Sequence, residues 1–106
     1  MIAASGRAAT DRTMSGWILY IVRCRDGSLY TGITTDLARR LQEHEAGRGR
    51  GASYLRGRSP LVVQFTHRFA DRRTASRAEY AVKRLSKQAK ERLAAGMLEI
   101  GSLVDQ

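Results

Sequence analysis

The first strongly apolar stretch of the chain, Trp17 to Val22, predicts a β-strand, because it is rich in aromatic and β-branched residues. An Asp26-Gly27 pair, typical of tight turns, follows it, and a second run, L-Y-T-G-I, comes next. Apolar side chains occupy both sets of alternating positions in the first run, which indicates a strand covered on much of both faces. Residues 17–33 are therefore expected to form a hairpin inside the molecule.

The length of the turn decides where two tyrosines of this hairpin, Tyr20 and Tyr30, point. With a two-residue loop, the phenols fall on opposite faces of the sheet. With a three-residue loop in which Gly27 is left-handed and forms a bulge, Tyr20 pairs with Gly32 and both phenols share a face. In that register Gly32 leaves room beside Tyr20 for a substrate or a backbone. The sequence leaves both registers open.

The pattern after the hairpin predicts a helix and a third strand. A capping residue, Thr35 or Asp36, precedes two leucines four residues apart, and Gly47 ends this helical pattern. Apolar and polar residues then alternate over 61–69, which predicts a strand.

The last third of the chain has an apolar stripe at helical spacing over 74–95, and Ser86 is expected to cap a second helix after a break. The order β-β-α-β-α-α predicts a small α/β sandwich in which about three helices flank a three-stranded, mainly antiparallel sheet. A length of 106 residues indicates one domain. We expect it to span 16–96, between a flexible N-terminal tail over 1–15 and a C-terminal tail over 97–106.

The charge balance indicates a polyanionic partner. Nineteen Lys and Arg residues oppose ten Asp and Glu residues, which gives a net charge of +9. A small basic domain without a membrane segment most often binds nucleic acid. Most of these cations are arginines and the chain has no asparagine, as a GC-rich genome would also produce. The basic charge can therefore also be a by-product of composition in a structural or partner-binding protein.

The cysteine content and the hydropathy of the chain indicate the cellular compartment. Cys24 is the single cysteine, which excludes an intramolecular disulfide and a cysteine-based zinc site. No apolar run approaches the roughly 18 residues of a membrane span, and the start of the chain lacks the apolar segment of a signal peptide. We therefore expect a cytoplasmic protein with no membrane partner, monomeric by default. Met14 is an alternative start to Met1.

The segment between the first helix and the third strand, residues 47–60, combines four arginines and four glycines with one tyrosine. This composition predicts an irregular, flexible loop whose cations bind phosphate and whose aromatic ring stacks on a base. The candidate nucleic-acid ligands are Arg48, Arg50, Tyr54, Arg56 and Arg58.

Four further polar residues are candidates for chemistry, and each also has an ordinary structural explanation. Tyr20 and Tyr30 can be strand aromatics with their hydroxyls at the sheet edge. Arg40 can pair with Asp36 one turn earlier in its helix. His44 can complement the partial negative charge at a helix C-terminus.

Glu79 is the fifth candidate. It can close a capping box with Ser76 or pair with Lys83, and both would be purely structural roles. Because Glu79 also adjoins the apolar stripe of its helix, its carboxylate is expected at the edge of the core, where it needs a cation. One carboxylate, together with waters and phosphate oxygens, is a typical way to hold Mg²⁺.

These residues together resemble the GIY-YIG nuclease superfamily, whose two tyrosine motifs flank a short hairpin. The first motif here reads Ile18-Leu19-Tyr20, in which Ile18 and Leu19 replace the family's Gly and Ile, and the second reads Y-T-G from Tyr30. Arg40 and His44 match the family's catalytic arginine and a further family position, and Glu79 matches its metal-binding glutamate. The resemblance covers about 16–96 and is nearest to the small, single-domain bacterial branch.

The resemblance implies an endonuclease that hydrolyses phosphodiester bonds with one Mg²⁺ (or Mn²⁺) ion, on DNA in preference to RNA. Glu79 would hold the metal and Arg40 would bind the phosphate. Tyr20 would be the general base, relayed through His44, and Tyr30 would orient the water. Gly27 and Gly32 would have structural roles. The alternative is a non-catalytic nucleic-acid-binding module on the same scaffold.

Overall fold

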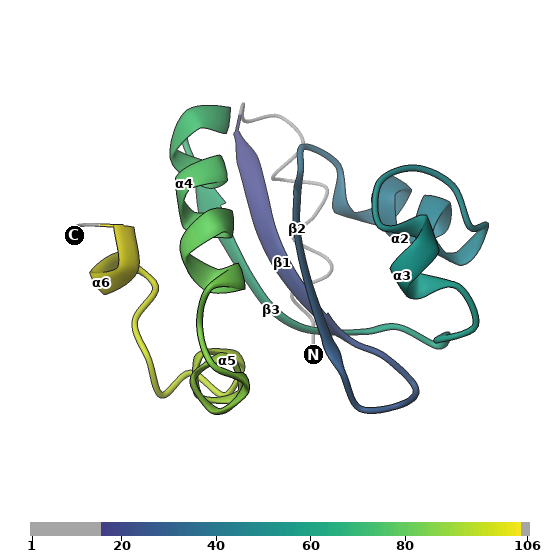
Figure 1. The fold of residues 1–106 in the computed structure, drawn as a ribbon. Coiled ribbons are helices and arrows are strands. Elements are labelled where there is room, and N and C mark those ends of the chain that lie inside the picture. Colours follow the sequence, from purple (N-terminus) through teal and green to yellow (C-terminus); the bar gives the residue numbers. More distant parts are fainter. Residues whose placement is uncertain (1–15, 105–106) are drawn as a thin grey trace.

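The computed structural model describes residues 16–104, so the expected N-terminal tail over 1–15 lies outside the described residues. Three antiparallel strands form one sheet in the order β2-β1-β3. Helices α4, α5 and α6 lie on one side of this sheet, and α2 and α3 lie on the other (Figure 1). The elements are β1 (Trp17–Arg23), β2 (Leu29–Thr34), α2 (Leu37–Glu45), α3 (Ala52–Leu55), β3 (Val62–Phe69), α4 (Arg72–Lys83), α5 (Lys87–Ala94) and α6 (Gly101–Val104).

The predicted fold class is confirmed. The three longest helices, α2, α4 and α5, follow the strands in the predicted β-β-α-β-α-α order, and α3 and α6 are additional four-residue helices. Asp36 caps α2 and Ser86 caps α5, each by accepting a hydrogen bond from a backbone N–H three residues later. No helix within residues 16–104 is long and apolar enough to cross a membrane.

The β1–β2 hairpin adopts the register of the three-residue loop. The backbone N–H of Cys24 donates to the carbonyl of Ser28 at 2.8 Å, and Tyr20 pairs with Gly32. Gly27 has a φ of 89°, in the left-handed region that favours glycine. Tyr20 and Tyr30 therefore lie on the same face of the sheet, because strand side chains alternate with a period of two.

The main core lies between the sheet and α4. Leu19 and Ile21 of β1 are fully buried there against the small inner side chains of α4. Each such aliphatic side chain contributes about 1.5–3 kcal/mol by leaving water. The buried members are Leu19, Ile21, Phe69, Ala75, Ala78, Val82, Leu93 and Ile100. Ile100, from the segment expected as a C-terminal tail, is thus part of this core.

Helix α4 begins earlier than the sequence pattern predicted. Asp71 is its N-cap, and its carboxylate accepts a hydrogen bond from the backbone N–H of Thr74 at 2.8 Å. Ser76 consequently lies inside the helix, and Glu79 lies in its middle. The capping-box explanation of Glu79 is therefore wrong, and its carboxylate does not cap the helix.

Candidate active site

A pocket of about 210 Å³ opens beside β2, the edge strand next to both α4 and α2. It collects side chains from distant parts of the chain. Four of the five candidates for chemistry line it, and His44 lies directly behind Tyr20. The lining residues are Tyr20, Tyr30, Gly32, Ile33, Arg40, Glu43, Arg50 and Glu79.

Tyr20 and His44 form a buried pair at the back of the pocket. Tyr20 Oη and His44 Nε2 share a hydrogen bond of 2.8 Å, and Nδ1 of His44 has no hydrogen-bond partner among the described residues. Burial raises the pKa of Tyr20 to about 12, with Tyr30 acting in the same direction and Arg40 against it. Burial, followed by the charge of Arg40, lowers the pKa of His44. At neutral pH the phenol is thus protonated and the imidazole is uncharged.

Gly32 provides the space that Tyr20 occupies. A Cβ atom at position 32 would collide with the hydroxyl and ring carbons of Tyr20. The room expected beside Gly32 for a substrate is therefore filled by the protein's own phenol. Substrate must therefore reach the pocket from a side other than Gly32, among the partly buried side chains of Tyr30, Arg40 and Glu79.

The glycine-rich loop after α2 packs against the same site. Gly49 and Gly51 have φ values of 84° and 85°, which favour glycine. A Cβ at Gly51 would collide with the hydroxyl of Tyr30, and one at Gly49 would collide with the guanidinium of Arg40. The alternation of glycine and arginine thus lets the loop backbone lie directly on two candidate site residues.

Arg40 is held from two directions. Its Nη1 donates to Oε1 of Glu43 at 2.8 Å, and its Nη2 donates to the backbone carbonyl of Arg50. The side chain is 12% exposed. Its ionic partner is Glu43 and not Asp36, whose carboxylate caps α2. The guanidinium is therefore fixed at the pocket wall.

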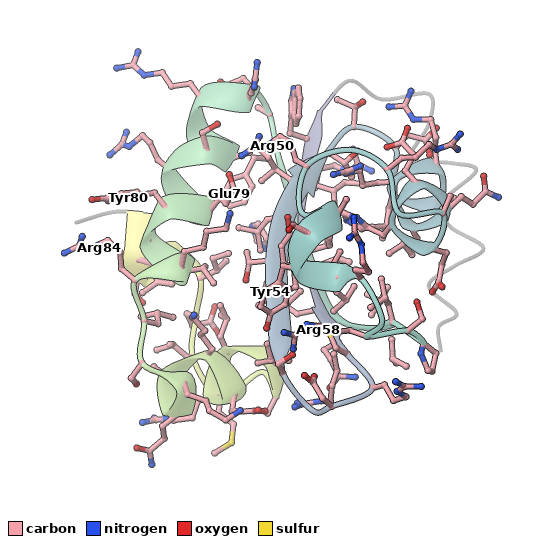
Figure 2. The ribbon with its side chains drawn as sticks, turned by 45° about the vertical axis from the view of Figure 1, so that its right-hand side comes forward. Arg50, Tyr54, Arg58, Glu79, Tyr80 and Arg84 are labelled. Atoms are coloured by element: carbon pink, nitrogen blue, oxygen red, sulfur yellow. The ribbon has the colours of Figure 1, made fainter. Side chains whose placement is uncertain are left out.

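Glu79 reaches the pocket from α4, on the opposite side of β2 from Arg40, and points toward the sheet in Figure 2. Oε2 of Glu79 lies 3.1 Å from Nζ of Lys83, so the predicted ordinary pairing with Lys83 is present. The Glu79 side chain is 13% exposed, and Nζ of Lys83 also lies 5.9 Å from the ring centroid of Tyr30.

The carboxylates of the pocket limit what metal it can hold. Glu43 pairs with Arg40, and Glu79 pairs with Lys83. Because Lys83 is 45% exposed and Arg40 is 12% exposed, Glu79 is the pocket carboxylate whose partner is more easily displaced by a metal ion. Within residues 16–104, no cluster of three His, Cys, Asp or Glu side chains could hold a metal ion. Mg²⁺ commonly binds through one or two carboxylates and fills its other positions with water and phosphate oxygens. The donor set therefore fits Mg²⁺ or Mn²⁺ better than a metal that needs several protein ligands.

The five predicted nucleic-acid ligands fall into two groups. Arg50 lines the pocket, and Arg48 and Arg56 are exposed to solvent. Tyr54 and Arg58 instead have partners within the protein: the Tyr54 ring stacks on Tyr30, with 5.6 Å between centroids, and the Arg58 guanidinium lies 4.3 Å from the Tyr54 ring centroid. Figure 2 shows these two side chains beside α3.

The loop itself is more regular than predicted. It contains α3, and it is tied to the β1–β2 turn: Arg58 pairs with Asp26, and the backbone N–H of Arg25 donates to the carbonyl of Arg58 at 2.7 Å. The prediction of an irregular loop over 47–60 is wrong for residues 52–55 for this reason. The tether fixes the aromatic stack that covers one side of the site.

Sequence reasoning missed several residues of the pocket. Glu43 could have been found from its i+3 spacing to Arg40, which is a usual distance for helical ion pairs. The only sequence signal for Gly49 and Gly51 was the alternation of glycine and arginine in this loop. Their contacts to Arg40 and Tyr30 join segments whose proximity depends on the folded loop.

The chain is similar to known proteins over most of its length. A family model described as the GIY-YIG catalytic domain matches residues 16–92. The chain is 51% identical over 85 residues to a UPF0213 protein of Cronobacter sakazakii, covering 80% of this chain and 87% of that protein. It is also 51% identical over 82 residues to the UPF0213 protein YhbQ of an Escherichia coli strain, covering 77% of this chain and 80% of that protein.

Two solved structures share the fold. The solution structure of the UPF0213 protein BH0048 from Bacillus halodurans has a TM-score of 0.50 and 45% identity, covering 76% of this chain and 83% of that one. The solution structure of EF2693 from E. faecalis has a TM-score of 0.55 and 37% identity, covering 76% of this chain and 84% of that one.

Proposed function

The chain belongs to the GIY-YIG family, and from this premise we propose that it is a metal-dependent endonuclease that hydrolyses phosphodiester bonds, in DNA rather than RNA. The observation that carries the proposal is the meeting of Tyr20, Tyr30, Arg40 and Glu79 in one pocket. These residues come from four different elements: β1, β2, α2 and α4. They provide two hydroxyls, a cation and a carboxylate, which are the groups that phosphodiester hydrolysis requires.

Arg40 is the proposed phosphate ligand. Glu43 and the carbonyl of Arg50 fix its guanidinium, so little side-chain freedom is lost when an anion binds. Arg50 also lines the pocket and adds a second cation at the same wall. Together they bind the scissile phosphate and offset the charge that develops on its oxygens.

Glu79 is the proposed metal ligand. A Mg²⁺ or Mn²⁺ ion bound there supplies Lewis-acid activation of a phosphate oxygen and stabilises the leaving oxygen. Glu79 contributes one negatively charged oxygen ligand, and its partial burial keeps it close to the phosphate held by Arg40. Lys83 must turn away from the carboxylate when the metal binds.

Tyr20 and His44 are proposed to move the proton of the attacking water. With a pKa of about 12, Tyr20 does not act as a free phenolate at neutral pH. Its oxygen accepts a proton from water while its own proton passes to Nε2 of His44, 2.8 Å away. The hydroxide formed attacks phosphorus while the bond from phosphorus to the leaving oxygen breaks. The leaving oxygen takes a proton from solvent, and the buried imidazolium returns its proton to solvent through Tyr20, because burial disfavours its charge. Tyr30 orients the water.

The rest of the chain fits this role. Arg48 and Arg56 are exposed on the loop between α2 and β3 and are proposed to hold the nucleic-acid strand, whereas Tyr54 and Arg58 support Tyr30. The lone buried Cys24 suits a protein that works in the reducing cytoplasm.

One observation favours a second candidate, a non-catalytic nucleic-acid-binding module. Lys83 already neutralises Glu79, so a nucleic acid can bind Arg40 and Arg50 without any metal. This candidate predicts binding without a cleaved product. The two candidates therefore separate on whether Mg²⁺ generates product.

The test is nicking of supercoiled plasmid by the purified protein with Mg²⁺ and with EDTA. We expect E79Q and R40Q to lower the Mg²⁺-dependent rate by at least about 100-fold, because each removes a group that stabilises the transition state. The matched controls are E99Q and R92Q, which make the same chemical changes at exposed positions outside the pocket. Equal nicking by E79Q and E99Q would refute the nuclease, and DNA binding without nicking by the wild type would establish the binding module.

A further inference from the structure

Helix α4 presents three distinct faces. Its inner face, Ala75, Ala78 and Val82, is buried in the core. A flank carries Glu79 and Lys83 toward the pocket. Successive helical residues are rotated by about 100°, so the residues diametrically opposite the core form a third face: Arg73, Arg77, Tyr80 and Arg84.

This third face, here called the outer stripe, is exposed along its whole length. Tyr80 is 64% exposed, which is high for a large aromatic side chain. Nη1 of Arg84 donates to Oη of Tyr80 at 3.1 Å, and the Arg84 guanidinium lies 5.3 Å from the Tyr80 ring centroid. Figure 2 shows Tyr80 and Arg84 pointing away from the sheet, whereas Glu79 points toward it.

The composition of the outer stripe is not that of an ordinary solvated helix face. Such faces usually alternate charges of opposite sign at i,i+4 spacing. Here Arg73 and Arg77 place two like charges at that spacing, which destabilises an isolated helix, and no carboxylate lies on the stripe. Tyr80 holds the Arg84 guanidinium in place and so lowers the entropy lost when it binds an anion. An elongated polyanion is the partner that complements these features.

We propose that the outer stripe binds the sugar-phosphate backbone of duplex DNA that extends from the pocket around α4. This inference rests on the proposed function, because it assumes that the pocket receives DNA. Lys83, 45% exposed between the pocket and the stripe, makes the basic surface continuous. Arg73 to Arg84 spans about 16 Å at about 1.5 Å per residue. That length covers about five phosphates of one strand at about 3.4 Å each.

The experiment measures the binding of a 30-base-pair DNA duplex in EDTA, where no cleavage occurs, as a function of salt concentration. The test variant is R73Q/R77Q, and the control is K87Q/R92Q, which removes the same charge from exposed positions on α5, outside the pocket. Glutamine has nearly the helix propensity of arginine and lysine, so both variants should fold. Circular dichroism and thermal unfolding verify this.

We expect the negative slope of log K against log salt to become shallower by about two in R73Q/R77Q, since each lost phosphate contact removes about 0.9. Affinity near 0.1 M salt should fall about 60-fold, which is the loss of two contacts over one decade below 1 M salt, and the control should keep the wild-type slope. Equal effects of the two variants would overturn the proposal, because diffuse charge alone would then explain binding. An absence of wild-type binding at low salt would also overturn it.

The result is separable from the nuclease assay. A stripe-specific loss of binding, combined with no Mg²⁺-dependent nicking by the wild type, supports the outer stripe and refutes the nuclease. Nicking that depends on Glu79, combined with equal binding by the stripe variant and its control, refutes the outer stripe alone.

Discussion

Nζ of Lys83 lies 3.1 Å from Oε2 of Glu79, so the candidate metal ligand is neutralised by a cation of its own helix. An ion that binds Glu79 must compete with this ammonium group. The strength of the competition is modest, because Lys83 is 45% exposed and a pair of that kind is worth about 0.5–1 kcal/mol.

The first prediction concerns this competition. K83M should raise the affinity for Mn²⁺ about two- to fivefold, since the pair no longer opposes binding. E79Q should abolish binding at this site. Isothermal titration calorimetry with Mn²⁺ measures both, without any need for catalysis.

The control for K83M is K87M. Lys87 forms the same i,i+4 pair with Glu91, at 3.5 Å, but lies outside the pocket. K87M should leave Mn²⁺ affinity unchanged. If K83M binds Mn²⁺ no better than K87M does, Lys83 does not compete for the metal.

The second prediction concerns the two loop glycines. G51A should destabilise the fold by about 1–2 kcal/mol for its left-handed backbone, and by more for the collision with Tyr30. Gly47 has a φ of 74° and nothing near its missing Cβ, so G47A incurs the backbone cost alone. Urea unfolding gives the free energy of unfolding of both variants, and the difference between the two values measures the effect of the collision with Tyr30. Equal destabilisation would show that the loop does not press on Tyr30.

The third prediction concerns the pH dependence of stability through Tyr20. Burial raises its pKa from 10.0 to about 12 in the folded protein, so ionisation favours the unfolded chain. The stabilisation is fully present below pH 10 and is lost as the pH rises through about 12, amounting to at most about 3 kcal/mol.

Urea unfolding between pH 8 and pH 11 checks this prediction by comparing the wild type with Y20F. The unfolding free energy of the wild type should fall more steeply above pH 10 than that of Y20F, which has no phenol to ionise at this position. Y30F provides the reference for loss of a less buried tyrosine hydroxyl. Parallel curves for wild type and Y20F would contradict a buried, protonated Tyr20.

The fourth prediction concerns the loss of stability at acidic pH through Glu91. Hydrogen bonds from Arg23 lower the pKa of Glu91 to about 2, and Arg23 thereby ties β1 to α5 through contacts of 2.9 and 2.7 Å. Because the pKa of Glu91 is lower in the folded protein than its ordinary value of 4.5, the ionised carboxylate stabilises the fold at pH values above 4.5. This stability is lost as the pH falls toward about 2. The melting temperature of E91Q should therefore depend less on pH over this range than that of the wild type. E99Q, an exposed carboxylate variant, should retain the wild-type dependence.

Local patterns predicted most of the framework. Alternation and turn chemistry located the hairpin, and Gly27 indicated a bulged loop as one of two registers. The capping residue of α4 could not be read from sequence, because Asp71 and Ser76 are both good caps and only the packed helix distinguishes them. The choice mattered, since it decided whether Glu79 was a capping group or a pocket residue.

The candidate site was predicted as a set of residue types and not as a set of contacts. Arg40 and Tyr30 were identified, but the glycines that press on them were not, because their proximity arises from the course of a loop. Tyr54 and Arg58 were assigned to DNA, and their partners Tyr30 and Asp26 are also distant in sequence. The composition of a loop rich in aromatic and cationic residues is the same whether these side chains contact a ligand or contact each other.

The Tyr20 phenol packs over Gly32 because these two residues pair in the hairpin. The same strand pairing therefore determines both the packing of the hairpin and the position of this candidate site residue. A hairpin that slipped by one residue would turn this phenol to the opposite face and set a bulkier neighbour against it. Misaligned chains would thus be inert as well as badly packed, so selection for activity at this pocket would at the same time preserve accurate folding.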